Sequence, residues 1–196
     1  MKDILAFIHV KKTGGISLQC LLAEQYGTKF YGGYTTPLKK IVAVNHSLEK
    51  DQLHELPSNS CVCKHWTYFE LGEIKERANF ITIIREPISR ITSHYNFYLM
   101  HHPKGKTFSE YVQEQENINI YSRFLPSDTS LLAEIYLFEN LKDCLSRSKF
   151  VKNFNNLRKE NKTVYKYKLS SDDIKIFNKI NEKDLEFFKV LKTDAL

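Results

Sequence analysis

Short apolar runs of β-forming residues recur along the chain and predict a set of strands. The first run, Ile4–Ile8, is apolar throughout and bounded by polar residues, which is typical of a strand buried on both faces of a parallel sheet. The run Phe80–Ile84 has the strongest β character in the sequence. Further strands are predicted at Cys61–Cys63 and Glu134–Phe138, with a short one at Ile41–Val44.

Between these runs the apolar residues take the spacing of helices. A helix is predicted directly after Gly14-Gly15, where apolar residues recur from Ile16 to Leu22, and another from Pro87 to about Met100, since proline suits a first helical turn. A terminal amphipathic helix is predicted from Ile174 to Leu191. Shorter helices are predicted from Ser47 to Pro57, at Asn140–Ser146, and twice between Pro103 and Leu132, with a loop at Tyr26–Pro37.

Strands that alternate with helices in this way predict an α/β fold, with a central, mainly parallel sheet flanked by helices. The chain has 196 residues, of which 42% are hydrophobic, and only seven glycines and five prolines, which excludes collagen-like, low-complexity and disordered proteins. No internal repeat or linker interrupts it. We therefore expect a single domain over residues 1–196.

The N-terminal segment and the cysteines indicate in which cellular compartment the protein is expected. The apolar run before His9 is too short for a secretory signal or a membrane span, so we expect a cytoplasmic protein without stable membrane insertion. The four cysteines are few and irregularly spaced, which indicates reduced, packed thiols. His101-His102 has no partner ligands at a diagnostic spacing, and no metal is expected.

The charge favours an anionic partner. Lys and Arg number 29 against 23 Asp and Glu, a formal net charge of +6, which does not choose among a nucleotide, a polyanion and a membrane surface. Part of this charge is expected at one cleft, beside which we place five cations: Lys11, Lys12, Lys64, Arg85 and Arg90.

Three predicted strands end in cationic or titratable residues, namely Lys11-Lys12, Lys64-His65 and Arg85. Ligands of parallel sheets bind beyond the carboxyl ends of the strands, so these residues are expected to converge. The first end is also a glycine turn running into a helix, where backbone amides and the helix dipole favour a phosphate. The donors expected there are Lys12 and the hydroxyls of Thr13 and Ser17.

This loop is not a Walker A loop, because its lysine precedes the glycines Gly14 and Gly15, and ATP is accordingly disfavoured. A second element strengthens the phosphate interpretation. Ser93 follows Arg85 by eight residues, two turns into the next helix, where both could face one anion. Taken alone, Arg85 could equally pair with Glu86 on the surface.

Together these segments resemble the sulfotransferases that use 3′-phosphoadenosine 5′-phosphosulfate (PAPS), and within them the branch of heparan and chondroitin sulfate sulfotransferases and their bacterial relatives. Phe7-Ile-His-Val-Lys-Lys-Thr-Gly-Gly-Ile-Ser17 resembles the family's 5′-phosphosulfate loop, F-x-H-[IV]-P-K-T-G-G-T-S. Ile83-Ile-Arg-Glu-Pro-Ile-Ser-Arg-Ile-Thr-Ser-His-Tyr95 resembles its 3′-phosphate element, L-R-[DE]-P-x-x-R-x-x-S-x-Y. Fainter likenesses lie at Lys64-His65-Trp66, Asn117–Arg123 and Tyr136–Leu141.

The chain departs from that pattern at three positions. Lys11 stands in place of proline, Ile16 in place of threonine, and Lys64 in place of the glycine before the histidine. None of these changes removes a residue that the chemistry requires.

The resemblance implies a P-loop-NTPase-like sulfotransferase fold and in-line transfer of a sulfuryl group from PAPS to an acceptor hydroxyl, expected to belong to a carbohydrate. It assigns donor binding to Lys12, Thr13, Gly14, Gly15, Ile16, Ser17, Arg85 and Ser93. It also favours Lys12 as a catalytic cation and His65 as the general base, since imidazole can accept a proton at neutral pH. His46 is the second candidate for the base, and both His46 and Arg123 are candidates for substrate contacts, with Arg123 equally able to brace the structure.

Two other functions stay open from sequence. One is a nucleotide-dependent kinase or NTPase, which the missing Walker loop disfavours. The other is a non-catalytic module that binds polyanions through the basic stretch from Lys142 to Lys168. The chain carries no recognisable nucleic-acid-binding signature, so a nucleic-acid partner is not expected.

Overall fold

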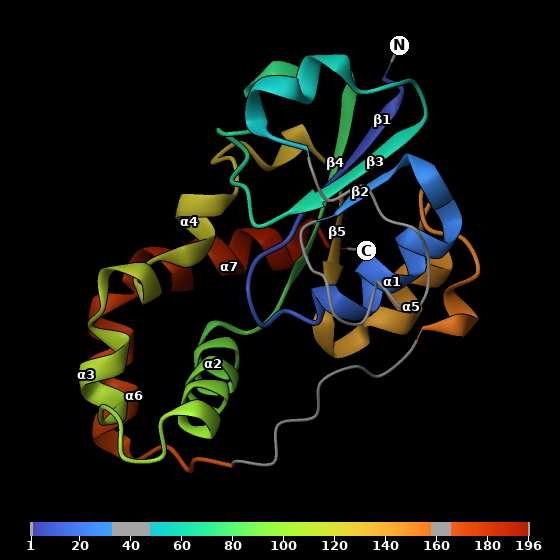
Figure 1. The fold of residues 1–196 in the computed structure, drawn as a ribbon. Helices are drawn as coiled ribbons and strands as arrows, with labels where there is room; N and C mark the ends of the chain where they lie inside the picture. Colours follow the sequence, from blue (N-terminus) through green and yellow to red (C-terminus); the bar gives the residue numbers. More distant parts are fainter. Residues whose placement is uncertain (1, 33–47, 158–165, 196) are drawn as a thin grey trace.

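The computed structural model describes residues 2–32, 48–157 and 166–195, which contain a five-stranded parallel sheet with helices on both faces (Figure 1). The strand order is β2-β3-β1-β4-β5, so that β1 lies at the centre between β3 and β4. This confirms the predicted α/β fold class. The strands are β1 (Ile4–Ile8), β2 (Phe30–Gly32), β3 (Ser60–Lys64), β4 (Ala78–Ile84) and β5 (Leu132–Leu137).

Seven α-helices and a set of short 3₁₀ helices connect and cover the strands within the described residues. The α-helices are α1 (Gly15–Tyr26), α2 (Pro87–His101), α3 (Phe108–Val112), α4 (Ile120–Phe124), α5 (Leu141–Arg147), α6 (Ser171–Ile180) and α7 (Glu182–Thr193). The 3₁₀ helices are η1 (Gly27–Lys29), η3 (Lys50–Glu55), η4 (Gly72–Ile74), η5 (Gln115–Asn117), η6 (Thr129–Leu131), η7 (Phe138–Asn140) and η8 (Phe154–Asn156). None of these helices is long and apolar enough to cross a lipid bilayer.

The alternation of side chains along β1 divides the core into two layers. Ile4, Ala6 and Ile8 pack on the face that Leu191 of α7 covers, whereas Leu5 and Phe7 pack on the face covered by α1 and α5. All five residues of β1 are buried, as expected for a central strand with helices on both sides.

A third apolar cluster joins α2, α3 and α6 beside the sheet (Figure 1). Tyr95 of α2 lies at its centre, in edge or tilted contact with Phe108, Tyr111 and Tyr167. Phe177 from α6 completes the packing. This cluster holds α2 at the edge of the sheet where β4 ends.

Most predicted elements are found, and the differences have local causes. The first strand, the helix after Gly14-Gly15, the strand to Ile84 and the helix from Pro87 lie where the sequence predicts them. The segment predicted as a loop from Tyr26 instead contains the last residue of α1 and the three-residue strand β2, which is too short to show a period. The predicted helix before Pro57 is the 3₁₀ helix η3, β5 begins two residues before the prediction, and the predicted strand Ile41–Val44 lies outside the described residues.

The predicted terminal helix is two helices, α6 and α7, which meet at Asn181. The Asn181 side chain is buried and accepts a hydrogen bond from the amide of Asn119 at 2.8 Å. It also donates to the carbonyl of Phe177 at 3.4 Å. Asparagine thus ends α6 and ties the junction to the segment before α4, a tertiary contact that the apolar spacing of the sequence does not reveal.

We predict that Asn181→Leu lowers the free energy of unfolding by about 1–3 kcal/mol, because the amide of Asn119 loses its partner. Urea unfolding followed by circular dichroism measures this change. The control is Asn155→Leu, at an exposed asparagine, which should stay within about 0.5 kcal/mol of wild type. Equal effects of the two substitutions would contradict the assigned role of Asn181.

Candidate active site

The loop between β1 and α1 forms a cradle of backbone amides. Lys12 and Gly14 both take left-handed conformations, with φ of 68° and 86°, and such conformations recur at functional loops. α1 then begins at Gly15 without a side-chain cap and without an acidic residue in its first turn. The start of α1 is therefore a position where backbone amides and the helix dipole stabilise a bound anion.

Both glycines of the loop are required by close contacts. A Cβ atom on Gly15 would lie 2.1 Å from the ring of His9, and one on Gly14 would lie 2.6 Å from the ring of Phe138. The loop backbone is therefore pressed between a ring from the end of β1 and a ring from the end of β5.

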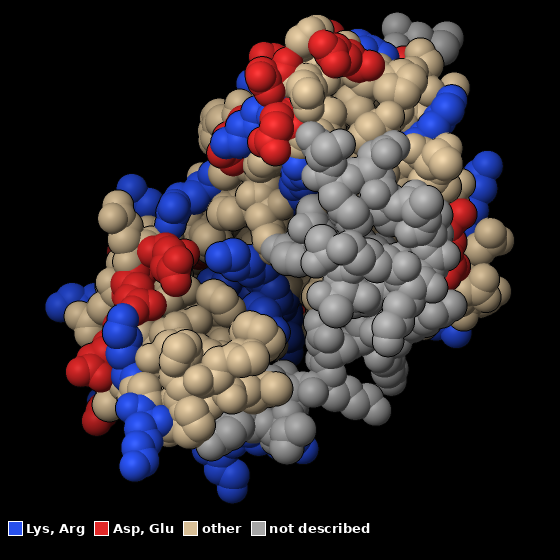
Figure 2. Space-filling view, in the orientation of Figure 1, with Lys and Arg blue, Asp and Glu red and all other residues tan. Residues whose placement is uncertain are grey.

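A cavity of about 350 Å³ opens beside this loop. Figure 2 shows Lys and Arg side chains gathered in the hollow between the α2–α3 part of the molecule and the sheet. Among the described residues its wall contains no Asp or Glu. It is lined by His9, Lys11, Lys12, Gly14, Gly15, Ile16, Ser17, His65, Arg85, Ser93, His94, Phe97 and Phe138.

The two partly buried cations of the cavity each rest on an aromatic ring. The ammonium nitrogen of Lys12 lies 4.5 Å from the ring centre of Phe97, and the guanidinium carbon of Arg85 lies 4.5 Å from that of Phe138. Burial lowers the pKa of Lys12, and the nearby charge of Arg85 lowers it further. Burial likewise lowers the pKa of Arg85. A bound anion would offset this cost of burying two positive charges.

His65 is held by the backbone of the neighbouring strand. Its Nδ1 lies 2.6 Å from the carbonyl oxygen of His9, and a carbonyl only accepts, so Nδ1 carries the proton and Nε2 the lone pair. Burial lowers the pKa of His65 to about 4, and Lys11 adds to this effect, against the opposing hydrogen bond. The ring is therefore neutral at neutral pH and able to accept a proton at Nε2.

A second cavity, of about 360 Å³, lies against α2 and shares Arg85 and Ser93 with the first. Its wall adds hydroxyl and amide groups of α2 and the exposed Lys166. Arg85 and Ser93 therefore stand between the two cavities, where a ligand could contact them from either one. The other lining residues of the second cavity are Ile88, Ser89, Thr92, Asn96 and Leu169.

Most residues predicted for the site meet at the first cavity, including Lys12, Ser17, His65, Arg85 and Ser93. The strand order explains this meeting, because β1 has β3 and β4 as its two neighbours. Arg85 does not form the alternative surface pair with Glu86, whose carboxylate caps α2 instead. The side chain of Thr13 is turned away, since its hydroxyl donates to the carbonyl of Val10 at 2.9 Å.

Other predicted residues lie elsewhere. The exposed Arg123 donates to the carbonyl of Gln115 at 2.8 Å and lines neither cavity. His46 lies outside the described residues.

Two of the five cations placed beside the cleft, Lys64 and Arg90, line neither cavity. The ammonium of Lys64 donates to the carbonyl of Leu48 and lies over the ring of Trp66. Arg90 is buried in the core, with its guanidinium carbon 6.0 Å from the ring centre of Tyr121. The surroundings of these two cations are set by tertiary packing, which their place in the sequence does not show.

Four residues that line the first cavity were not predicted as site residues: His9, His94, Phe97 and Phe138. His94 and Phe97 follow Ser93 by one residue and by one helical turn, so the position of Ser93 on a helix could have indicated them. Phe138 follows β5 directly, and the rule that ligands lie beyond strand ends applied to it as well.

No protein-family model matches the chain, and no curated protein matches it. Among solved structures, mouse sulfotransferase SULT7A1 in complex with PAP is similar over 95% of this chain and 67% of that chain, with 14% identity and a TM-score of 0.44. A sulfotransferase from Alicyclobacillus acidocaldarius is similar over 100% of this chain and 97% of that chain, with 11% identity and a TM-score of 0.46. At these values the likeness does not decide what this chain binds, and its function rests on its own residues.

We predict that the free energy of unfolding falls as the pH drops from about 6.5 toward about 4. The pKa of His65 is lowered in the folded chain, so between these values the unfolded chain binds the proton that the folded chain refuses. The pKa of His94 is lowered to about 4 in the same way, by burial and by Arg90. Urea unfolding at several pH values should give a weaker slope for His65→Gln than for wild type. The same slope for both, or an NMR titration of His65 near 6.5, would contradict the environment described.

Proposed function

We propose that this chain is a cytoplasmic, single-domain PAPS-dependent sulfotransferase whose acceptor is a carbohydrate hydroxyl. One observation carries the proposal: Lys12, Arg85, Ser93 and His65 all line the first cavity. The described wall of that cavity contains no carboxylate. Lys12 lines the first cavity alone, whereas Arg85 and Ser93 also line the second, so an anion that carries more than one charged group fits this arrangement. Lys12 lies in the first of the two sequence motifs, Arg85 and Ser93 lie in the second, and His65 lies between the motifs.

The donor fits the residues present. The amides at the start of α1, with Lys12 and Ser17, would hold its 5′ end, on a loop whose backbone is packed between the rings of His9 and Phe138. Arg85 and Ser93 would hold the 3′-phosphate, for which the forked guanidinium suits a charge-assisted contact. The donor supplies the activated sulfuryl group, and the protein supplies position and charge.

In the transfer step, the acceptor oxygen forms a new bond to sulfur as the bond from sulfur to the bridging phosphate oxygen breaks. The acceptor's hydroxyl proton goes to Nε2 of His65, which holds the lone pair because Nδ1 donates to the carbonyl of His9. Lys12 and the loop amides stabilise the charge that grows on the leaving phosphate.

The alternatives have less support from the site. A kinase or NTPase would use a lysine that follows the glycines, whereas Lys12 precedes Gly14. A polyanion-binding module would use an open basic surface and would not need a partly buried imidazole such as His65 beside the cations. A carbohydrate acceptor is favoured by the aromatic and basic lining, which offers Phe97 and Lys11 at the mouth of the cavity.

We predict that 3′,5′-adenosine bisphosphate binds much more tightly than AMP, and that Arg85→Ala removes most of this preference. A charge-assisted hydrogen bond contributes roughly 1.5–3 kcal/mol, so the preference should fall about 10- to 150-fold. Isothermal titration calorimetry measures both ligands. The control is Arg147→Ala, at an exposed arginine that pairs with Asp143 at 2.9 Å. A wild-type protein that binds both nucleotides equally would rule out the proposed donor site.

We predict that the protein transfers labelled sulfate from PAPS to a member of a panel of glycans, lipids and small alcohols. His65→Gln should lower kcat about 10²- to 10⁴-fold, because the acceptor proton loses its base, and should leave bisphosphate binding in place. His54→Gln, at an exposed histidine of η3, is the control. Binding of the bisphosphate without labelling of any acceptor, or full activity of His65→Gln, would refute the catalytic assignment.

A further inference from the structure

The hydroxyl of Tyr121 engages both backbone groups of Arg85. It accepts a hydrogen bond from the amide of Arg85 at 2.9 Å and donates one to the carbonyl of the same residue. The pairing between β4 and β5 ends at Ile84, one residue earlier. Strand pairing holds the backbone of the residues before Arg85, and the hydroxyl of Tyr121 holds the backbone of Arg85 itself, just beyond the end of the sheet.

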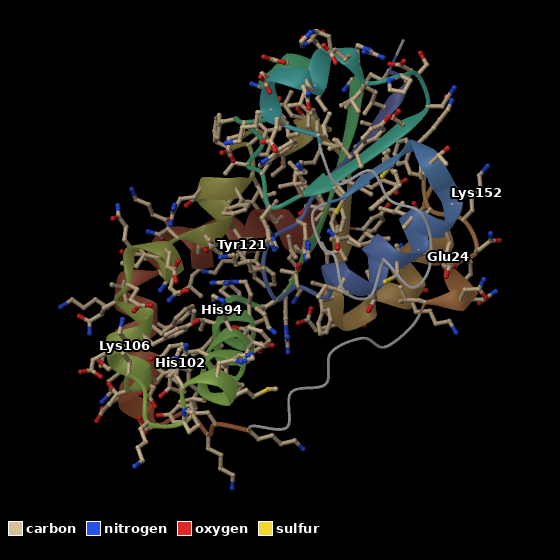
Figure 3. All side chains as sticks on the ribbon, in the orientation of Figure 1. Glu24, His94, His102, Lys106, Tyr121 and Lys152 are labelled. Carbon is tan, nitrogen blue, oxygen red and sulfur yellow. The ribbon has the colours of Figure 1, made fainter. Side chains whose placement is uncertain are left out.

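Tyr121 is itself held firmly by α7. Its amide donates to one carboxylate oxygen of Asp184 at 2.9 Å, and the amide of Ser122 donates to the other at 3.0 Å. The ring of Phe188 stacks on the Tyr121 ring, with centres 6.2 Å apart and planes 21° apart. Figure 3 labels Tyr121 where α4 meets α7. The phenol ring is fully buried, so its hydroxyl has a fixed position.

The protonation state of Tyr121 suits this double contact. Burial raises its pKa well above the ordinary value for tyrosine, so the hydroxyl keeps its proton and can donate to the carbonyl of Arg85 at any physiological pH. Without that hydroxyl, both backbone groups of Arg85 would lose a partner in a half-buried place. The guanidinium would then depend for its position on the ring of Phe138 and on its hydrogen bond to the carbonyl of Lys12 at 3.5 Å.

We infer that Tyr121 is a positioning residue, which sets the place of the Arg85 guanidinium by fixing the backbone that carries it. The inference rests on the proposed function for the identity of the ligand. Because α7 holds Tyr121 in place, this helix also helps to position Arg85, although it is remote in sequence from both motifs.

The test compares Tyr121→Phe with wild type in the binding of 3′,5′-adenosine bisphosphate and AMP. Loss of the hydroxyl should weaken bisphosphate binding about tenfold and leave AMP binding within about twofold, because only the bisphosphate carries the 3′-phosphate assigned to Arg85. In the transfer assay, KM for PAPS should rise while kcat at saturating donor changes little.

The matched control is Tyr136→Phe. Tyr136 is also fully buried, and its hydroxyl bonds to Glu134 and to Ser148, but it packs on the opposite face of the sheet. Both substitutions should lower the urea midpoint, whereas only Tyr121→Phe should change the ratio of the two affinities. A change of that ratio in both variants, or in neither, would overturn the positioning role.

Amide hydrogen exchange on the wild-type chain keeps the inference testable if Tyr121→Phe does not fold. The amide of Arg85 should be protected, as its bond to the buried hydroxyl requires, and exchange at the rate of an exposed amide would refute the inference. A different result would refute the proposed function, namely a wild-type protein that binds the bisphosphate no more tightly than AMP. Preference in wild type with an unchanged ratio in Tyr121→Phe would refute the positioning role alone.

Discussion

Two cations, Lys12 and Arg85, are partly buried in one cavity whose described wall offers them no carboxylate. Withdrawing a charge from water costs free energy, and the lowered pKa values of both groups express that cost. At Arg85 the charges of Glu139 and Glu86 offset part of it. The rest of the fold offsets this cost, because packing elsewhere supplies the free energy of folding that keeps the two cations partly buried.

Aromatic rings, in place of carboxylates, order these cations. Phe97 lies under Lys12 and Phe138 under Arg85, and a ring attracts a cation without cancelling its charge. A carboxylate at either position would fix the side chain equally well but would compete with an incoming anion. The ring of Phe138 also presses against Gly14, so the same residue that orders Arg85 limits the phosphate-binding loop.

The sequence predicts the part of this arrangement that depends on local signals. Strand ends, a glycine pair and a proline in a first turn indicate β1, β4, α1 and α2, and through them Lys12 and Arg85. Burial in the fold decides the rest. Lys64 and Arg90 are indistinguishable from the site cations in sequence, yet one turns to the carbonyl of Leu48 and the other enters the core beside Tyr121.

For the same reason, the sequence does not predict the contribution of α7 to the site. Its apolar spacing predicts a helix and a core contact, and Leu191 confirms that contact. Its polar role depends on Asp184, which is buried and accepts hydrogen bonds from the amides of Tyr121 and Ser122 in the first turn of α4. Those amides would otherwise be unpaired at the start of a five-residue helix that cannot be stable alone. The carboxylate of Asp184 in α7 therefore stabilises α4 at its observed position. That position in turn brings the hydroxyl of Tyr121 to the end of β4.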